Sequence, residues 1–119
     1  MNSFACVYYL TDSGKSPVEE FIKSLNQRTR QKFFACVSLL EEYGKGLPGP
    51  HAKYIGNGIY ELRVRGQEGH IRVLYFFFQR KEIIFTNGFI KKTNKVPKKE
   101  KDLAELRKQS YLERTEDDD

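Results

Sequence analysis

The sequence predicts a single α+β domain, in which an antiparallel meander sheet packs against an N-terminal helical hairpin and is followed by a C-terminal helix. Three observations lead to this fold class. The chain has 119 residues, the size of one domain. Apolar residues recur with helical spacing near the N-terminus and with a period of two in the centre. Short runs of turn residues lie between the central segments, as between the strands of β-hairpins. The domain is expected to cover residues 1–112.

The N-terminal part is expected to contain one strand and a helical hairpin. Residues 4–10 are rich in aromatic and β-branched side chains, which predicts a strand. Ser16 followed by Pro17 predicts the start of a first helix, because serine caps helices and proline suits the first helical position. A second helix is expected over about residues 28–43, where Gly44 is well placed to end it.

Four further strands, joined by tight turns, are expected in the central part. Asn57-Gly58 is a strong hairpin turn between the first two. The third is apolar apart from Arg72, a pattern typical of a central strand buried on both faces. The expected strands cover residues 52–55, 59–65, 71–78 and 82–90.

The C-terminal part is expected to form one helix and an acidic tail. Pro97 opens the helix, which is expected to run to about Leu112 with Leu103 and Leu106 as a thin apolar stripe. Residues 113–119 hold five acids and one arginine. Short acidic runs of this kind are usually solvated, so the tail is expected to be disordered.

Charge and composition narrow the functional class. The net charge is +5, and residues 63–101 hold 11 basic and three acidic side chains, which indicates an anionic partner for this half of the chain. The longest apolar run, residues 73–78, is too short to span a membrane. No signal peptide is visible, so a cytoplasmic protein without a membrane partner is expected. The two cysteines are expected to be buried thiols.

Most enzyme motifs are absent from the sequence. No glycine-rich loop lies between a strand and a helix, so no nucleotide fold is indicated. The two histidines are 19 residues apart and lack metal-ligand spacing, and neither cysteine has an obvious histidine partner. We therefore expect no metal and no cofactor.

A set of cations on the expected sheet is the main candidate for a site. Arg63 and Arg65 share a strand face because strand side chains alternate. Arg72 interrupts a buried strand, where an unpaired charge is costly unless a pocket exposes it. Guanidinium groups donate paired hydrogen bonds to phosphate, and several could stabilise the pentacoordinate phosphate formed when a ribose 2′-oxygen attacks its neighbouring phosphodiester. Lys91 and Lys92 follow the last strand.

Plainer interpretations of these residues remain open. Arg72 is equally able to pair with Glu61 or Glu68, leaving the other cations merely solvated. His51 and His70 are natural proton-transfer groups beside phosphate-binding arginines, but each falls in or next to a turn, where histidine is more often a surface residue.

Three stretches of the chain carry a family resemblance. They are YELRVR at 60–65, HIRVLYF at 70–76 and NGFIKKTNKVPKKE at 87–100. In their order and spacing the chain resembles the RelE/HigB toxins of bacterial type II toxin–antitoxin systems, most closely the phage-derived HigB-like branch. The resemblance covers roughly residues 4–111 and implies a RelE-like fold. It also implies a cytoplasmic, metal-independent endoribonuclease that cleaves messenger RNA, usually on a translating ribosome.

The resemblance, together with the cationic set on the expected sheet, gives the cations their expected roles. Arg72 falls on the family's phosphate-binding arginine, with Arg63 and Arg65 neutralising charge in the transition state. The RNA backbone is expected to contact Lys91, Lys92 and Lys53.

The chain departs from the family pattern in its proton-transfer groups. Glu61 stands where some members carry a catalytic lysine, and Tyr111 matches their C-terminal tyrosine only by residue type. The acid and the base are therefore not assigned by the resemblance.

The resemblance also implies partners. They are messenger RNA and a cognate antitoxin with a helix-turn-helix domain, through which alone the toxin would meet DNA. Two other classes stay open: a non-catalytic module that binds RNA or DNA, and an interaction protein whose basic face meets only an acidic chain.

Overall fold

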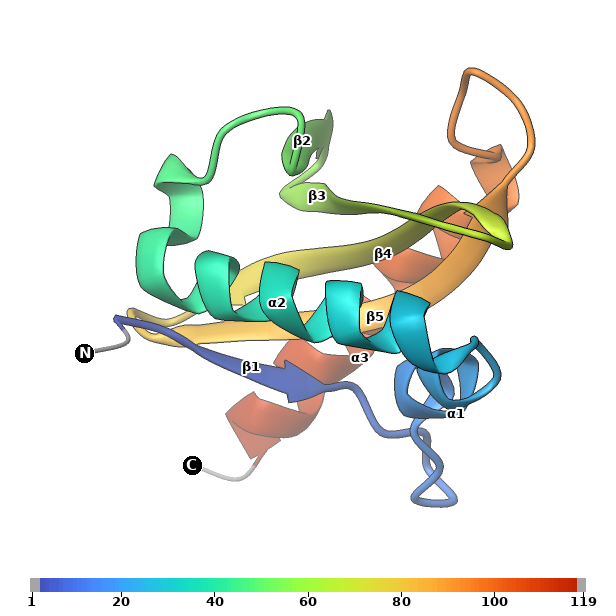
Figure 1. Ribbon diagram of the computed structural model, residues 1–119. Coiled ribbons are helices and arrows are strands. Elements are labelled where there is room, and N and C mark those ends of the chain that lie inside the picture. The colour runs from blue at the N-terminus through green and yellow to red at the C-terminus, as the bar shows by residue number, and fades with distance from the viewer. Residues whose placement is uncertain (1–2, 118–119) are drawn as a thin grey trace.

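The computed structural model describes residues 3–117, with side chains through residue 115, and arranges them in three layers. A five-stranded sheet lies between a pair of helices on one face and a single helix on the other (Figure 1). The elements in chain order are β1 (Ala5–Tyr8), α1 (Pro17–Lys23), α2 (Gln27–Tyr43), a 3₁₀ turn (Gly44–Gly46), β2 (Ala52–Gly56), β3 (Ile59–Gly66), β4 (Gly69–Phe78), β5 (Glu82–Lys91) and α3 (Lys98–Asp117).

The sheet has the strand order β1-β5-β4-β3-β2. Strands β2 to β5 form the expected antiparallel meander, whereas β1 pairs with β5 in parallel at the opposite edge. At the β2–β3 turn Asn57 and Gly58 have φ values of 55° and 79°, the left-handed geometry that this dipeptide favours in tight hairpins. The predicted α+β fold class is confirmed.

The helical pair begins and ends close to the predicted residues. The Ser16 hydroxyl accepts a hydrogen bond from the backbone N–H of Glu19, which caps α1. The Asn26 side chain accepts from the N–H of Thr29 and caps α2 in the same way. Gly44 ends α2 with φ +54°, and a Cβ there would overlap the ring of Phe4. The local sequence therefore fixes both helix starts and the end of α2.

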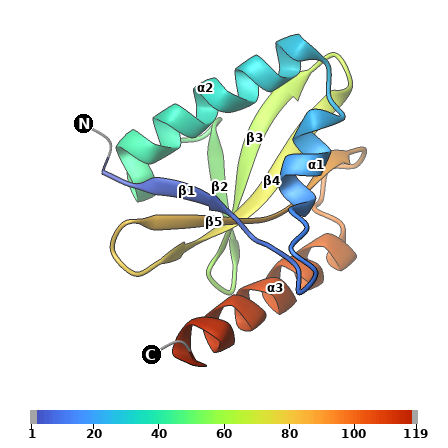
Figure 2. The ribbon, with the colours of Figure 1, turned by 90° about the horizontal axis from the view of Figure 1, so that it is seen from below.

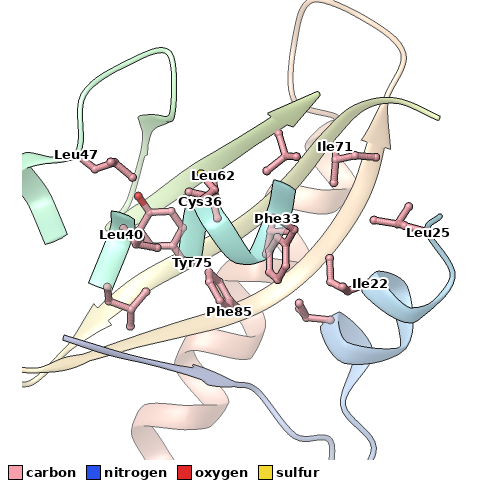
Figure 3. Close-up of a cluster of buried hydrophobic side chains, with 14 residues drawn as sticks. Ile22, Leu25, Phe33, Cys36, Leu40, Leu47, Leu62, Ile71, Tyr75 and Phe85 are labelled. Atoms are coloured by element: carbon pink, nitrogen blue, oxygen red, sulfur yellow. The ribbon is translucent and has the colours of Figure 1, made fainter. Parts of the chain in front are cut away.

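The main hydrophobic core lies between the sheet and the helices α1 and α2 (Figure 3). Alternate residues of the strands point into it, as period-two patterning requires. Phe33 of α2 is fully buried and contacts the ring of Phe85 on β5, and Tyr75 of β4 is 1% exposed. This core is apolar, and it contains more of the buried side chains than the cluster beneath α3 does.

Helix α3 packs against the opposite face of the sheet (Figure 2). A smaller apolar cluster there is completed by Ala104 of α3, and the ring of Tyr111 packs edge-on against Phe76 and Phe78 of β4. The predicted stripe on α3 is wrong at Leu106, which is 66% exposed.

Polar contacts determine which side of α3 faces the sheet, and the apolar residues alone did not predict that side. Arg107 donates a hydrogen bond to the backbone oxygen of Thr86, and Asn87 donates to the backbone and side chain of Glu100. Lys108 donates to the backbone oxygen of Asn57 in the β2–β3 turn. The helix is thus fixed to β5 and to the hairpin turn by its long polar side chains.

Residues 113–117 of the expected acidic tail are helical in the structure. Helix α3 continues to Asp117, beyond the predicted end at Leu112. Arg114 explains the extension, because it donates hydrogen bonds to the Tyr9 hydroxyl at 2.9 Å and to the Leu10 backbone oxygen at 2.7 Å. Residues 118–119 lie outside the described residues.

Within residues 3–117, none of the helices combines the length and the apolar character needed to cross a bilayer.

Candidate functional site

The strand register brings the predicted arginines together on the α3 face of the sheet, in the part that α3 leaves uncovered. Arg63 of β3 lies directly opposite Arg72 of β4, and Arg65 lies opposite His70. Directly opposed residues of an antiparallel pair point to the same face. Arg63, Arg65 and Arg72 therefore form one cationic cluster, as the alternation of β3 predicted.

Glu61 lies beneath this cluster and joins two of its members. The Nε atoms of Arg63 and Arg72 each lie 2.9 Å from the same carboxylate oxygen, Oε1 of Glu61. Glu61 is 1% exposed, so the carboxylate is held out of water. The plainer interpretation, in which Arg72 pairs with Glu61, is correct for this contact. It also means that two guanidinium groups are fixed side by side.

The ion pair leaves part of the cluster without hydrogen bonds. Within the described part of the chain, the buried Oε2 of Glu61 and Nε of Arg72 have no hydrogen-bond partner, although Arg72 Nε lies within ion-pair distance of Oε1. Burial lowers the pKa of Arg72 below its usual value, and the nearby Glu61 carboxylate partly offsets this. The guanidinium stays charged, because arginine side chains are not deprotonated in proteins.

Both histidines of the chain line a hollow above the cluster. This hollow has a volume of about 310 Å³ and is bordered by Pro50, Val64 and the three arginines as well as the histidines. His70 reaches it from β4, whereas His51 reaches it from the loop before β2, where its backbone oxygen accepts a hydrogen bond from the Arg63 N–H. Residues 19 positions apart in the sequence thus meet at one site.

The sequence favoured a surface position for each histidine, and in the structure His70 is exposed and His51 is half-buried, with both beside the arginines. Their spacing is uninformative because the β2–β3 hairpin and the β3–β4 hairpin bring them together only through the sheet. The signal that could have found His70 was its position opposite Arg65 in a hairpin closed at residues 66–69. No local signal places His51.

A second hollow, of about 410 Å³, adjoins Glu61 on the same face. Lysines surround it from three elements: Lys53 of β2, Lys91 at the end of β5 and Lys101 of α3, together with Lys95 of the loop before α3. Four ammonium groups and a single carboxylate give this hollow a positive field, which favours a polyanion with closely spaced charges. Of the lysines predicted to contact RNA, Lys53 and Lys91 lie here. Lys92 is exposed and lines neither hollow.

Residues 20–109, about three quarters of the chain, match the family described as Phage derived protein Gp49-like (DUF891). The chain belongs to this family. Gp49-like proteins are associated with the RelE/HigB-like toxins of toxin–antitoxin systems. A search of curated proteins found no match.

The stretch that matches the Gp49-like family contains the whole cationic cluster. All six predicted site residues and both histidines fall within residues 20–109. Tyr111 falls outside it and also outside the site. Its ring lies against Phe76 and Phe78, about 13 Å or more along β4 from Arg72. Burial raises the pKa of the Tyr111 hydroxyl, which makes it a poor base as well as a remote one.

The described residues include no cluster of metal-ligating side chains, and their two thiols are buried or partly buried. Among residues 3–117 no group of three or more histidine, cysteine or acidic side chains is arranged to hold a metal ion. Cys36 is buried and Cys6 is partly buried, and burial raises their pKa values to about 11 and about 12. Both thiols are therefore protonated and unreactive near neutral pH.

Proposed function

We propose that this Gp49-like protein is the toxin of a toxin–antitoxin system and cleaves messenger RNA as a metal-independent endoribonuclease. The observation that carries the proposal is the hollow in which two imidazoles and three guanidinium groups converge. Family membership supports it independently. Imidazole is the side chain best suited to exchange protons near neutral pH, and guanidinium is the best donor to phosphate.

In the proposed reaction one histidine, His51 or His70, takes the proton from the ribose 2′-hydroxyl. The 2′-oxygen attacks the adjacent phosphorus, and the bond from phosphorus to the 5′-oxygen breaks. The second histidine donates its proton to that leaving oxygen. The products are a 2′,3′-cyclic phosphate and a free 5′-hydroxyl, so atoms and protons balance without a metal.

The arginines stabilise the charge that develops on the phosphate. Arg72, which lies opposite Arg63 in the strand register, holds the scissile phosphate, and Arg63 and Arg65 neutralise the charge that develops on it. Preorganised donors of this kind contribute because they need no rearrangement during the reaction. Glu61 is a positioning residue: it is buried and keeps Arg63 and Arg72 adjacent despite their like charge.

The substrate is messenger RNA on a translating ribosome in the cytoplasm. The hollow is shallow and holds phosphate-binding groups rather than a pocket shaped for one base, so it offers little geometric control of its own. The ribosome supplies that control by fixing the backbone conformation of the message. Lys53 and Lys91 contact the flanking phosphates, and Lys92 adds an exposed charge beyond them.

Purified protein in a translation extract tests this function. The wild type is expected to shorten messages at discrete codons, with a bell-shaped pH dependence that reports an acid and a base. His51→Ala and His70→Ala are each expected to slow cleavage by about 100- to 10,000-fold, the usual contribution of general acid–base catalysis. Message retained intact would instead identify a non-catalytic binding module. Message neither cut nor bound would identify an interaction protein.

The cognate antitoxin, a helix-turn-helix protein, inhibits by covering the basic surface around the arginines and Lys91-Lys92. Charges that attract phosphate also attract an acidic segment. Reversing both lysines to glutamate is therefore expected to slow antitoxin association and to reduce its salt dependence. An antitoxin whose association with the double variant matches wild type at every salt concentration contacts another face, such as α1 and α2.

A further inference from the structure

A third hollow lies at the edge of the sheet formed by β2, on the side that faces the end of α2. It has a volume of about 190 Å³ and is lined by Tyr54, Tyr60 and Tyr75 together with Lys45, Lys53 and the backbone turn after α2. Apart from Lys53, the side chains of this small concave surface have no role in the reaction described above.

The tyrosines form a ladder across three strands. Tyr60 of β3 stacks on Tyr75 of β4 with ring centroids 5.4 Å apart and an interplanar angle of 17°. Tyr54 of β2 lies against Tyr60 at 4.9 Å. Tyr75 is 1% exposed and belongs to the core, so the ladder rests on a rigid base.

Tyr54 is the exposed end of this ladder. It is 54% exposed although it lies on a strand, and within residues 3–117 Tyr60 is the only ring that contacts it. Its hydroxyl accepts a hydrogen bond from the Gly58 N–H at 2.9 Å, which limits rotation of the side chain. One face of a fixed aromatic ring is therefore open to a planar ligand.

The charges near Tyr54 indicate what that ligand carries. Lys53 lines both this hollow and the lysine-rich hollow on the α3 face, and Tyr54 does the same, so the two hollows meet around the β2 edge. Lys45 borders the tyrosine hollow from the turn after α2. A ligand that is planar where it meets Tyr54 and anionic on either side fits this arrangement.

We propose that the tyrosine hollow binds a base of single-stranded RNA that flanks the cleaved phosphodiester. This inference rests on the proposed function, because the RNA runs from the arginine cluster past Lys53 to Tyr54. His51 and Tyr54 are three residues apart, or about 10 Å along an extended strand, so the bound base belongs to a neighbouring nucleotide. Stacking on tyrosine binds any base, so the site adds affinity without a strict sequence preference.

Binding of a short oligonucleotide that cannot be cleaved tests the inference directly. A fluorescently labelled 2′-O-methyl hexanucleotide lacks the attacking hydroxyl, so its anisotropy reports binding alone. Tyr54→Ala is expected to weaken binding about 5- to 150-fold, the range found when a stacking aromatic is removed. Tyr54→Phe keeps the ring and is expected to bind like wild type.

Two controls separate stacking from loss of structure or charge. Phe34 of α2 is 49% exposed but lines none of the three hollows, so Phe34→Ala is expected to bind like wild type. A probe of the same length with abasic positions keeps its phosphates. Tyr54→Ala is expected to bind this abasic probe as well as the wild type does.

Two results would overturn the base site. The first is equal binding of the base-containing probe by wild type and Tyr54→Ala. The second is a loss of affinity for the abasic probe in Tyr54→Ala as large as the loss for the base-containing probe. The outcome is separable from the test of cleavage. A protein that cuts message while Tyr54→Ala binds normally retains its function without this site. A protein that binds through Tyr54 but leaves message intact has the site without the function.

Discussion

The two faces of the sheet are built from the same strands and hold opposite chemistry. On the face toward α1 and α2, Leu62 and Val73 are at most 1% exposed and belong to a closed apolar core. One residue along the same strands, Glu61 and Arg72 point to the other face and form a charged cluster beside an open hollow. Around the arginine cluster, alternation of side chains thus separates the residues that stabilise the fold from those that meet the scissile phosphate.

The difference between the two faces predicts whether a substitution changes stability or activity. Changes to core residues between the sheet and the helices α1 and α2, away from the tyrosine hollow, should alter the free energy of unfolding and leave the chemistry of the folded molecules unchanged. Changes in the uncovered part of the other face should alter activity and have smaller effects on stability. The following predictions run from the largest expected effect to the smallest.

Phe33→Ala should produce the largest loss of stability. Phe33 is fully buried in α2 against Phe85, and truncation of such a ring typically costs about 3–5 kcal/mol. Urea unfolding measures the change. The neighbouring Phe34→Ala, at a half-exposed position, is the control and should cost about 1 kcal/mol or less. Equal losses for the two variants would contradict the assignment of the core to this face.

Glu61→Ala should have an intermediate effect, because Glu61 is the one residue of the charged cluster that is buried like a core residue. Its removal leaves Arg63 and Arg72 adjacent without the shared carboxylate. A loss of about 1–3 kcal/mol is expected, the usual cost of leaving buried polar groups without partners. Glu61→Gln keeps the shape and should lose less. Unchanged stability in both variants would show that the cluster needs no counter-ion.

Arg114→Ala should cost about 1 kcal/mol, because two hydrogen bonds to the segment after β1 are lost. Thermal unfolding measures it. Deletion of residues 113–119 removes the same contacts, so its melting temperature should also fall, whereas deletion of residues 118–119 alone leaves Arg114 in place. A melting temperature unchanged by Arg114→Ala would mean that the end of α3 does not stabilise the domain.

Glu68→Gln should change the pH dependence of stability more than stability itself. Glu68 accepts hydrogen bonds from the Thr29 hydroxyl and the Asn26 N–H, and these lower its pKa below the usual value of 4.5. A carboxyl whose pKa is lower in the folded state stabilises the fold above its unfolded pKa. It loses that contribution as the pH falls through the folded value.

Urea unfolding between pH 7 and pH 3 is the corresponding measurement. The wild type should lose stability below about pH 4.5 through this group, and Glu68→Gln should lose less over the same interval. Identical pH profiles would mean that the hydrogen bonds that Glu68, in the β3–β4 turn, accepts from the start of α2 contribute nothing to the loss of stability in acid.

Local patterns predicted most of the fold. Ser16-Pro17, Gly44 and Asn57-Gly58 each fixed a boundary through backbone chemistry that depends on neighbours in the chain. The rotation of α3 was not predictable in this way. Its sheet-facing side is held by Arg107, Lys108 and other polar side chains, so hydrophobic periodicity pointed to Leu106 instead.

Only part of the candidate site was predictable, namely the part whose residues are neighbours within one hairpin. Arg63, Arg65 and Arg72 follow from alternation within one hairpin, which the sequence displays directly. The histidine pair depends on how a loop before β2 returns to the sheet, and no spacing rule describes that path. The shared carboxylate of Glu61 was foreseen only as one of two possible partners of Arg72.

The rate of RNA cleavage by Arg72→Ala, measured beside its urea midpoint, tests the separation of the two faces most directly. Glu61 keeps Arg63 as a partner in this variant, so the fold should persist. The rate should fall about 100- to 1000-fold, the effect of removing one preorganised donor. Arg28→Ala, which removes an equal charge from an exposed position of α2, should cleave RNA at the wild-type rate. A folded Arg72→Ala with full activity, or one that unfolds, would contradict the account.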